Sequence, residues 1–289
     1  MRFSISTAFQ PVDHLSVLAR AADELGYHSM AVPDHVVDLE ELATPYPYTS
    51  DGSRRWSYDA AWPDPWVLVG SLAAVTTRLR FLTSIYVPAI RSPFQVAKSV
   101  GTAAVLSGNR VALGVGVGWC REEFELLGQD FSTRGRRTDE ALALMAELWK
   151  PGWTEFEGEF YSAPRLVMEP TPSEPIPILV GGLSEVAFRR AARHDGWVGD
   201  VYTTDEAIAH ATRLAEVRRD VGAEGDFSVI VALSDAFLPE QFEKAEAGGV
   251  TDCWTMPWAY YHGLDCSVEQ KVDALERFAT DVLEPLASR

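Results

Sequence analysis

Short apolar segments alternate with amphipathic helical segments along the whole of this 289-residue chain. In the first pair, the run "RFSISTAF" precedes a stretch with Leu15, Leu18 and Ala22 at helical spacing and Gly26 as its stop. About eight such pairs follow one another. Strands that alternate with helices form a parallel sheet with right-handed crossovers. Eight units in a chain of this length predict a (β/α)₈ TIM barrel, whereas the alternative, a doubly wound α/β sheet, usually needs fewer strands.

Two segments interrupt the alternation, so we expect one barrel domain over residues 1–289 that carries two insertions. Residues 35–63 follow the second predicted strand and are rich in Tyr, Trp and Pro, and residues 150–175 precede the fifth strand. Long loops in compact domains usually serve a function, and a loop that leaves a barrel strand opens onto the face that carries active sites. The first insertion is therefore expected to shape a site.

The charge balance restricts the partners of the chain. Lys plus Arg number 25 and Asp plus Glu number 42, which gives a formal net charge of −17 and argues against nucleic acid and anionic membranes as partners. Three cysteines without a C-x-x-C pair predict a reduced, cytoplasmic protein. No apolar run reaches the roughly 18 residues of a membrane span, and the six histidines lack a metal-binding spacing. A small-molecule substrate and no metal are expected.

The stretch "VALGVGVGWCREEF", residues 111–124, carries glycines in the pattern G-x-G-x-G. The dinucleotide-binding pattern is G-x-G-x-x-G after a first strand, so this stretch does not match it. On the fourth predicted strand, Gly114, Gly116 and Gly118 share one side because side chains alternate with a period of two. A flat ring could lie against a backbone without side chains there. The alternative is a tight barrel interior where only glycine fits.

Two other strand ends carry polar groups. Gly181 and Gly182 precede Ser184, which is a good helix N-cap, and backbone N–H groups at a helix start can bind phosphate. An ordinary strand–helix turn explains the same residues. In "AVPDHV", Asp34 and His35 end the second predicted strand, where an imidazole can carry a proton. The alternative for this pair is a helix cap or a hydrogen bond within the loop.

These stretches together resemble the bacterial luciferase-like superfamily, and within it the oxidoreductases that use the deazaflavin coenzyme F420. The matching order and spacing run through most of the chain and weaken after about Thr203. The segments that carry the resemblance are "LARAADELGYHSMAVPDHV", "YPYTSDG", "WPDPWVLVGSLAAVTTRLRFLTSIYVP", "RSPFQVAKSVGTAAVLSGNRVALGVGVGWCREEFELLG", "RGRRTDEALALMAELW" and "PIPILVGGLSEVAFRRAARHDGW".

The resemblance implies a homodimeric TIM barrel with F420, or alternatively FMN, at the C-terminal mouth. It implies a phosphate site at the fifth strand, a ring that rests on a non-proline cis peptide at Ser84–Ile85, and His35 as the catalytic proton carrier. Asp34 would lie near the pyrimidine edge of the ring. The cofactor-binding residues expected on this basis are Asp34, Thr83, Ser84, Ile85, Gly116, Gly118, Gly181, Gly182 and Ser184.

One position departs from the family pattern. The sugar-phosphate dehydrogenase branch has a catalytic carboxylate after the glycines of the fourth strand, and this chain has Trp119 there. Aromatic residues that form a lip beside this position predict a bulky apolar substrate. The alternative is that these residues only pack among the loops. The residues of that lip are Trp56, Trp62, Trp119, Trp258, Tyr260 and Tyr261, of which Trp56, Trp119, Trp258 and Tyr260 are the predicted substrate-binding residues.

Three functions remain open at this point. The first is hydride transfer between F420 and an organic substrate, with His35 as the proton carrier. The second is an FMNH₂-dependent monooxygenase, in which the reduced flavin reacts with dioxygen. The third is a member of the superfamily that binds or stores a cofactor without turnover, against which His35 argues.

Overall fold

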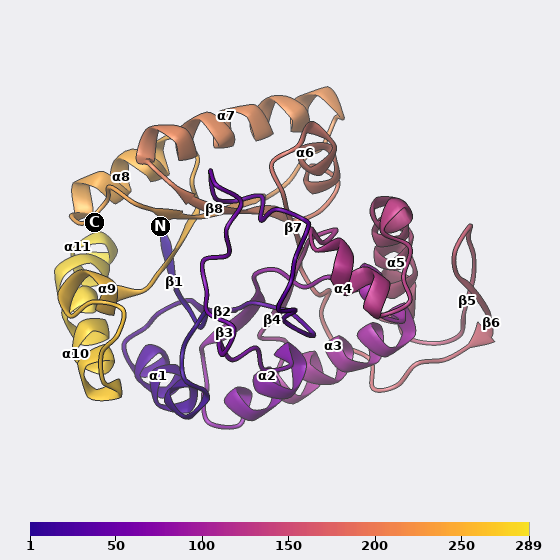
Figure 1. Ribbon diagram of the computed structural model, residues 1–289, viewed down its shortest axis with the longest axis horizontal. Helices are drawn as coiled ribbons and strands as arrows, with labels where there is room; N and C mark the ends of the chain where they lie inside the picture. The colour runs from indigo at the N-terminus through magenta and orange to yellow at the C-terminus, as the bar shows by residue number, and fades with distance from the viewer. Residues whose placement is uncertain (289) are drawn as a thin grey trace.

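A closed barrel of eight parallel strands forms the centre of the computed structural model, which describes residues 1–288 (Figure 1). The strand order around the barrel is β1-β10-β9-β8-β7-β4-β3-β2, so the predicted TIM barrel is confirmed. The strands are β1 (Arg2–Ser6), β2 (Ser29–Val32), β3 (Arg80–Thr83), β4 (Val111–Val115), β7 (Ile178–Gly181), β8 (Gly196–Tyr202), β9 (Ser228–Leu233) and β10 (Asp252–Thr255).

Helices surround the barrel in Figure 1. The longer ones are α1 (Val12–Glu24), α2 (Pro65–Ala73), α3 (Pro93–Ser107), α5 (Arg134–Leu148), α7 (Thr204–Asp220), α8 (Pro239–Ala247) and α10 (Val268–Phe278). The shorter helical segments are η1 (Pro88–Ile90), α4 (Arg121–Leu126), η2 (Phe131–Thr133), α6 (Glu185–Ala191), α9 (Pro257–Tyr261), η3 (Ala279–Leu283) and α11 (Glu284–Ala287). Within residues 1–288, no helix combines the length and apolar character that crossing a membrane requires.

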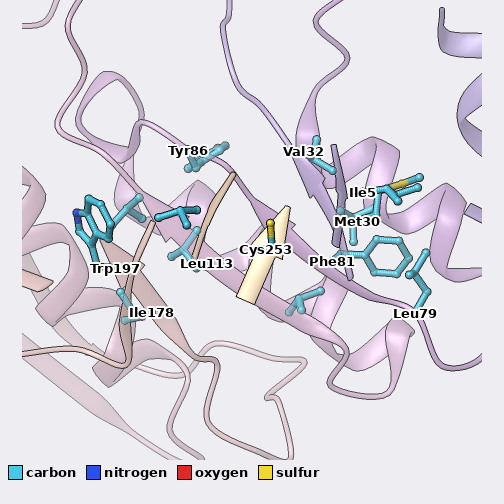
Figure 2. Packing of buried hydrophobic residues seen from close by; sticks show 14 of the residues in the cluster. Ile5, Met30, Val32, Leu79, Phe81, Tyr86, Leu113, Ile178, Trp197 and Cys253 are labelled. Carbon is cyan, nitrogen blue, oxygen red and sulfur yellow. The ribbon is translucent and has the colours of Figure 1, made fainter. Parts of the chain in front are cut away.

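Along β3, alternate residues enter two separate apolar clusters. Phe81 packs outward with Ile5 and Met30 in the large cluster between the sheet and the helices (Figure 2). Its neighbour Leu82 points into the barrel, where it meets Leu179, Val198 and Ile230. The barrel interior is therefore filled with side chains, and space for a ligand remains only at its end.

The two insertions differ from each other in structure. Residues 35–63 form neither helix nor strand, as predicted, and in Figure 1 this violet stretch between β2 and α2 crosses the view of the barrel. We call residues 35–63 the lid. The second insertion was expected to be a loop, but it contains the antiparallel hairpin of β5 (Thr154–Glu157) and β6 (Ser162–Leu166), beside α5. Glu140 of α5 accepts hydrogen bonds from the backbone N–H groups of residues 159–161 in this hairpin.

Gly114 of β4 and the two glycines that follow the strand, Gly116 and Gly118, have protein atoms close to the position that a Cβ would take. A Cβ on Gly114 would overlap the carbonyl oxygen of Thr83, and a Cβ on Gly116 would overlap Cδ1 of Ile85. A Cβ on Gly118, whose φ is +83°, would lie 2.6 Å from the ring of Phe124. The prediction that these glycines leave space for a flat ring is wrong for Gly114, because the backbone of β3 fills the space beside it. Gly116 and Gly118 line the cavity at the barrel mouth, and their contact with a ring stays a prediction. For Gly114 the alternative, a tight interior where only glycine fits, is the correct one.

The close approach at Gly114 has a measurable consequence. We expect Gly114→Ala to lower the free energy of unfolding by about 1–3 kcal/mol, because the added methyl group must displace the backbone of β3. Gly70→Ala is the matched control: it lies inside α2, a Cβ there would meet no other atom within 4 Å, and it should raise stability by about 0.5–1 kcal/mol. Urea unfolding of both variants tests this, and a Gly114→Ala variant as stable as the wild type would contradict it.

Candidate active site

A cavity of about 730 Å³ lies at the carboxyl ends of the barrel strands, under the lid. This volume is within the range of small-molecule sites. Most of the residues predicted for the site line this cavity, and they come from several different strand ends and the lid. The predicted residues that line it are Asp34, His35, Trp56, Ser84, Ile85, Gly116, Gly118, Trp119, Gly181 and Gly182.

His35 is held by a buried carboxylate from the fourth strand end. Its Nδ1 lies 3.2 Å from Oε2 of Glu123, while Oε1 of Glu123 accepts a hydrogen bond of 2.7 Å from the backbone of Val36. Burial alone would raise the pKa of Glu123, but the hydrogen bonds from His35, Val36 and Val37 outweigh it and hold this pKa below its usual value. An ionised carboxylate only accepts hydrogen bonds, so Nδ1 of His35 must carry a proton. Nε2 is then the nitrogen left to exchange a proton with a ligand.

Glu123 was not identified from the sequence as a site residue. It lies in the first turn of α4, four residues after Trp119. Trp119 is the position at which the sugar-phosphate dehydrogenase branch was expected to carry its catalytic acid. A signal was available in the sequence. His35 follows β2 and Glu123 follows β4, and in a barrel only β3 separates these two strand ends.

The adjacent Glu122 fixes another part of the lid. Its Oε1 accepts hydrogen bonds from the backbone N–H groups of Ala43 and Thr44, at 2.8 and 2.9 Å. Glu122 and Glu123 therefore hold both ends of one lid segment, residues 36–44. A third connection joins Arg55 of the lid to Asp200 of β8, with Nη1 2.8 Å from Oδ1. The lid thus has fixed contacts with α4 and with β8, on two sides of the mouth.

Aromatic rings enclose His35. Its ring centroid lies 4.9 Å from that of Trp62, 5.4 Å from Trp56 and 6.0 Å from Trp119. Tyr46 packs edge-on against both Trp56 and Trp119. The three tryptophans and Tyr46 all line the cavity. The wall beside His35 is therefore apolar, which restricts the water that can reach this side chain.

Asp34 braces the segment that follows β3. Both of its carboxylate oxygens accept hydrogen bonds of 2.7 Å from the guanidinium of Arg91, and one also accepts from the backbone of Val87. Burial raises the pKa of Asp34 above its usual value, and the charge and hydrogen bonds of Arg91 and the backbone of Val87 act against this rise. The bond between Ser84 and Ile85 in that segment is a non-proline cis peptide, as the resemblance implied. Contact between Asp34 and a cofactor ring stays a prediction.

The structure places four of the predicted site residues outside the cavity lining. Thr83 is buried and donates its hydroxyl hydrogen to the carbonyl of Gly114. Ser184 caps α6, where its hydroxyl accepts from the backbone of Ala187. Neither side chain is directed into the cavity, although the backbone at Gly181 and Gly182 lines it.

Trp258 and Tyr260 are the other two predicted site residues that do not line the cavity. Their assignment to an aromatic lip is wrong. They belong to the short helix α9, which the sequence analysis did not predict. Trp258 is fully buried against α10, with its ring 5.9 Å from Nζ of Lys271. Tyr260 stacks on Phe278 of the same helix at 6.3 Å. Packing between α9 and α10 keeps both rings away from the cavity. The alternative to substrate binding, that these aromatic rings serve packing, is therefore the correct one for Trp258 and Tyr260.

Arg134 adds a positive charge to the cavity wall. Its Nε and Nη1 donate to the carbonyl oxygens of Gly118 and Phe131, and its guanidinium lies 3.8 Å from the centre of the Phe131 ring. Within residues 1–288, no carboxylate forms an ion pair with Arg134. The guanidinium therefore remains available to an anion.

Several buried donors of the lining also lack acceptors. The indole N–H groups of Trp62 and Trp254 have no hydrogen-bond partner in the part of the chain that the structure describes, and neither does the hydroxyl of Tyr202. All three residues line the cavity. Buried donors without acceptors are costly, so the cavity suits a ligand that brings oxygen or nitrogen acceptors together with a negative charge. A flavin or deazaflavin phosphate has both properties.

Comparison with known proteins shows the family of this chain. The chain belongs to the Luciferase-like monooxygenase family, whose model matches residues 1–247. It is a luciferase-like oxidoreductase of the flavin- or deazaflavin-dependent kind. An uncharacterised protein of Mycobacterium tuberculosis is 40% identical over 98% of this chain and 99% of its own length. An F420-dependent glucose-6-phosphate dehydrogenase of Amycolatopsis mediterranei is 27% identical over 93% of this chain and 82% of its own.

The solved structure of monooxygenase RslO1 from Streptomyces bottropensis shares the fold. Its TM-score is 0.75 at 16% identity, with 99% of both chains covered.

The lid contact at Glu122 should depend on pH. Burial opposes its ionisation, but hydrogen bonds from the backbone of Glu122 itself, Thr44 and Ala43 lower its pKa from 4.5 to about 2. Because the folded-state pKa is lowered, the contact is complete above pH 4.5 and is lost as the pH falls towards 2. Pepsin should therefore cut the lid progressively faster across this interval, with little change elsewhere in the barrel. The control is the cleavage of an unfolded peptide by pepsin over the same pH range. If the rate of lid cleavage changes with pH only as much as the rate for this peptide does, the prediction is wrong.

The same contact can be tested at neutral pH. In Glu122→Ala the segment at Ala43 and Thr44 loses its acceptor, and we expect trypsin to cut after Arg54 or Arg55 several times faster than in the wild type. Glu125→Ala, an exposed position on the same helix, is the matched control and should leave the rate unchanged. Equal cleavage of both variants would show that Glu122 does not hold the lid.

Proposed function

We propose that this protein is an F420-dependent oxidoreductase that transfers a hydride between the deazaflavin and a bulky, apolar organic substrate. The observation that carries the proposal is the hydrogen bond between His35 and Glu123 inside an aromatic wall. Hydride transfer to or from carbon–oxygen bonds requires a partner that takes up or returns a proton. The named segments that resemble F420-dependent enzymes and the 27% identical F420-dependent dehydrogenase support F420 over FMN.

The cavity offers suitable groups for the cofactor. Arg134 and the backbone at Gly182 and Leu183 line the same wall, and they would hold the phosphate. Ser84, Ile85 and the backbone at Gly116 would lie against the ring. When bound, F420 supplies or accepts the hydride. The indole N–H of Trp254, buried at the barrel end without a partner among the described residues, could donate to the ring system.

The residues of the chain then divide the remaining work. Nε2 of His35 accepts a proton from the substrate in one direction and returns it in the other. Glu123 keeps the proton on Nδ1 and stabilises the imidazolium between these steps. Trp56, Trp62 and Trp119 bind the apolar part of the substrate and exclude water.

Cofactor binding is the first test. Titration of the protein with F420, reduced F420 and FMN, followed by fluorescence and by the change in Tm, should show tight binding of F420. Tight binding of FMN without detectable binding of F420 would overturn the cofactor assignment and favour the FMNH₂-dependent monooxygenase.

Replacing His35 separates catalysis from binding. We expect His35→Asn to lower turnover of a bulky apolar ketone with reduced F420 by about 10²–10⁴-fold, which is the usual contribution of general acid–base catalysis. The Kd of F420 should change little. His262→Asn is the control, since this histidine pairs with Asp273 and does not line the cavity. Unchanged turnover with weakened F420 binding would make His35 a binding residue instead.

Replacing Arg134 tests the phosphate site. Arg134→Gln should raise the Kd of F420 by about tenfold, because it removes a charge-assisted hydrogen bond. Arg121→Gln is the matched control, since Arg121 stacks on Phe131 at 4.5 Å but does not line the cavity. An equal loss of affinity in both variants would point to the general field of the protein rather than to a phosphate contact.

The homodimer that the resemblance implies remains a prediction. The mass measured by light scattering at micromolar concentration tests it directly.

A further inference from the structure

Phe9, in the loop that follows β1, has a backbone conformation that phenylalanine rarely adopts. Its φ is +61°, in the left-handed region that favours glycine. Hydrogen bonds of the neighbouring residues fix this turn. The hydroxyl of Ser6 accepts from the backbone N–H of Ala8. The backbone N–H of Gln10 donates to the carbonyl of Thr7, and its side-chain amide donates to the carbonyl of Ala8. A glycine would form the same turn with less strain, so the backbone does not explain the phenylalanine, and strain of this kind is typical of functional sites.

The ring of Phe9 lies at the edge of the cavity. It lines the cavity although the residue is 41% exposed, so the ring stands between the cavity and solvent. It stacks on Trp56 with the ring centroids 5.9 Å apart, and it meets Trp62 edge-on at 5.8 Å. Both tryptophans also contact the ring of His35. Phe9 is therefore the outer end of an aromatic wall that begins at His35.

The contact between the lid and the loop after β1 is apolar. Within residues 1–288, no hydrogen bond or ion pair joins the lid to residues 6–10. On its other sides the lid has hydrogen bonds to Glu122 and Glu123 of α4 and an ion pair with Asp200 of β8. Apolar contacts are non-directional, so they can adjust to a ligand without the loss of a hydrogen bond. The edge of the lid at Phe9 is thus the edge that can adapt to a substrate most easily.

We propose that Phe9 is a specificity-determining residue whose ring limits the length of the apolar group that the aromatic wall accepts. A substrate with its oxygen at Nε2 of His35 and its apolar part along Trp56 and Trp62 meets Phe9 at the far end. The turn holds the ring in this place, and a smaller side chain would lengthen the space along the wall. This inference rests on the proposed function for the position of the substrate oxygen.

Two ketones that differ in length provide the test. Cyclohexanone and 4-cyclohexylcyclohexanone share the ring with the carbonyl group, and the second carries another apolar ring opposite the oxygen. Their Kd values are measured by calorimetric titration in the presence of oxidised F420, which has no hydride to donate. We expect Phe9→Gly to favour the longer ketone over the shorter one by about tenfold relative to the wild type, because the vacated space buries the second ring.

Phe9→Ala separates the effect of the ring from that of the backbone. Both variants lack the ring, but only alanine keeps a side chain at positive φ, so Phe9→Ala should have the lower Tm of the two. The ratio of the two Kd values should nevertheless shift equally in both variants. Phe237→Gly is the matched control, since Phe237 is also exposed on a loop after a barrel strand but does not line the cavity. Its Kd ratio should equal that of the wild type.

The outcomes separate this proposal from the proposed function. A Kd ratio that does not shift towards the longer ketone in Phe9→Gly and Phe9→Ala, or no binding of either ketone, would overturn the role of Phe9 and leave the cofactor assignment intact. A ratio that shifts only in the less stable variant would show general damage to the wall and would also overturn it. If the protein binds FMN and not F420, the cofactor assignment fails, and the ratio measured with FMN present still decides the role of Phe9.

Discussion

The site depends on one buried carboxylate that holds two different parts of the molecule. Glu123 lies in the first turn of α4, the helix that follows β4, and it binds both the imidazole of His35 and the backbone at the start of the lid. A buried carboxylate without such partners would be costly. The lid therefore cannot leave its place without exposing or protonating Glu123, and the position of His35, the proposed proton carrier, is coupled to the closure of the cavity.

The charges around the cavity differ from those of the whole protein. The chain carries a net charge of −17, yet the cavity wall presents Arg134, and its two acidic residues Asp34 and Asp200 are paired with arginines. An anionic ligand must therefore be attracted over short distances, against the general field. This arrangement favours a ligand that makes specific contacts with its phosphate over anions in general, and it accords with a tightly held cofactor.

The sequence predicted the barrel and the mouth because both follow from patterns of local residues. Alternating strands and helices define the topology, and His35, Trp119 and Gly181 lie at strand ends that a parallel barrel must bring together. The sequence did not predict the role of Glu123, because its partner lies 88 positions away and depends on the conformation of the lid. Trp258 was misplaced because α9 was not recognised, and its burial against α10 depends on packing that no local pattern encodes. Gly114 was misjudged for a related reason, since the atoms that fill the space beside it belong to β3.

The most direct test of the account is the tautomer of His35, measured by nitrogen NMR of the imidazole in the free protein at neutral pH. The account predicts that neutral His35 carries its proton on Nδ1, facing Glu123, and that Glu123→Gln shifts this preference towards a mixture of tautomers. A wild-type His35 with its proton on Nε2, or one whose tautomer does not respond to Glu123→Gln, would contradict the claim that Glu123 prepares His35 to exchange a proton with a ligand.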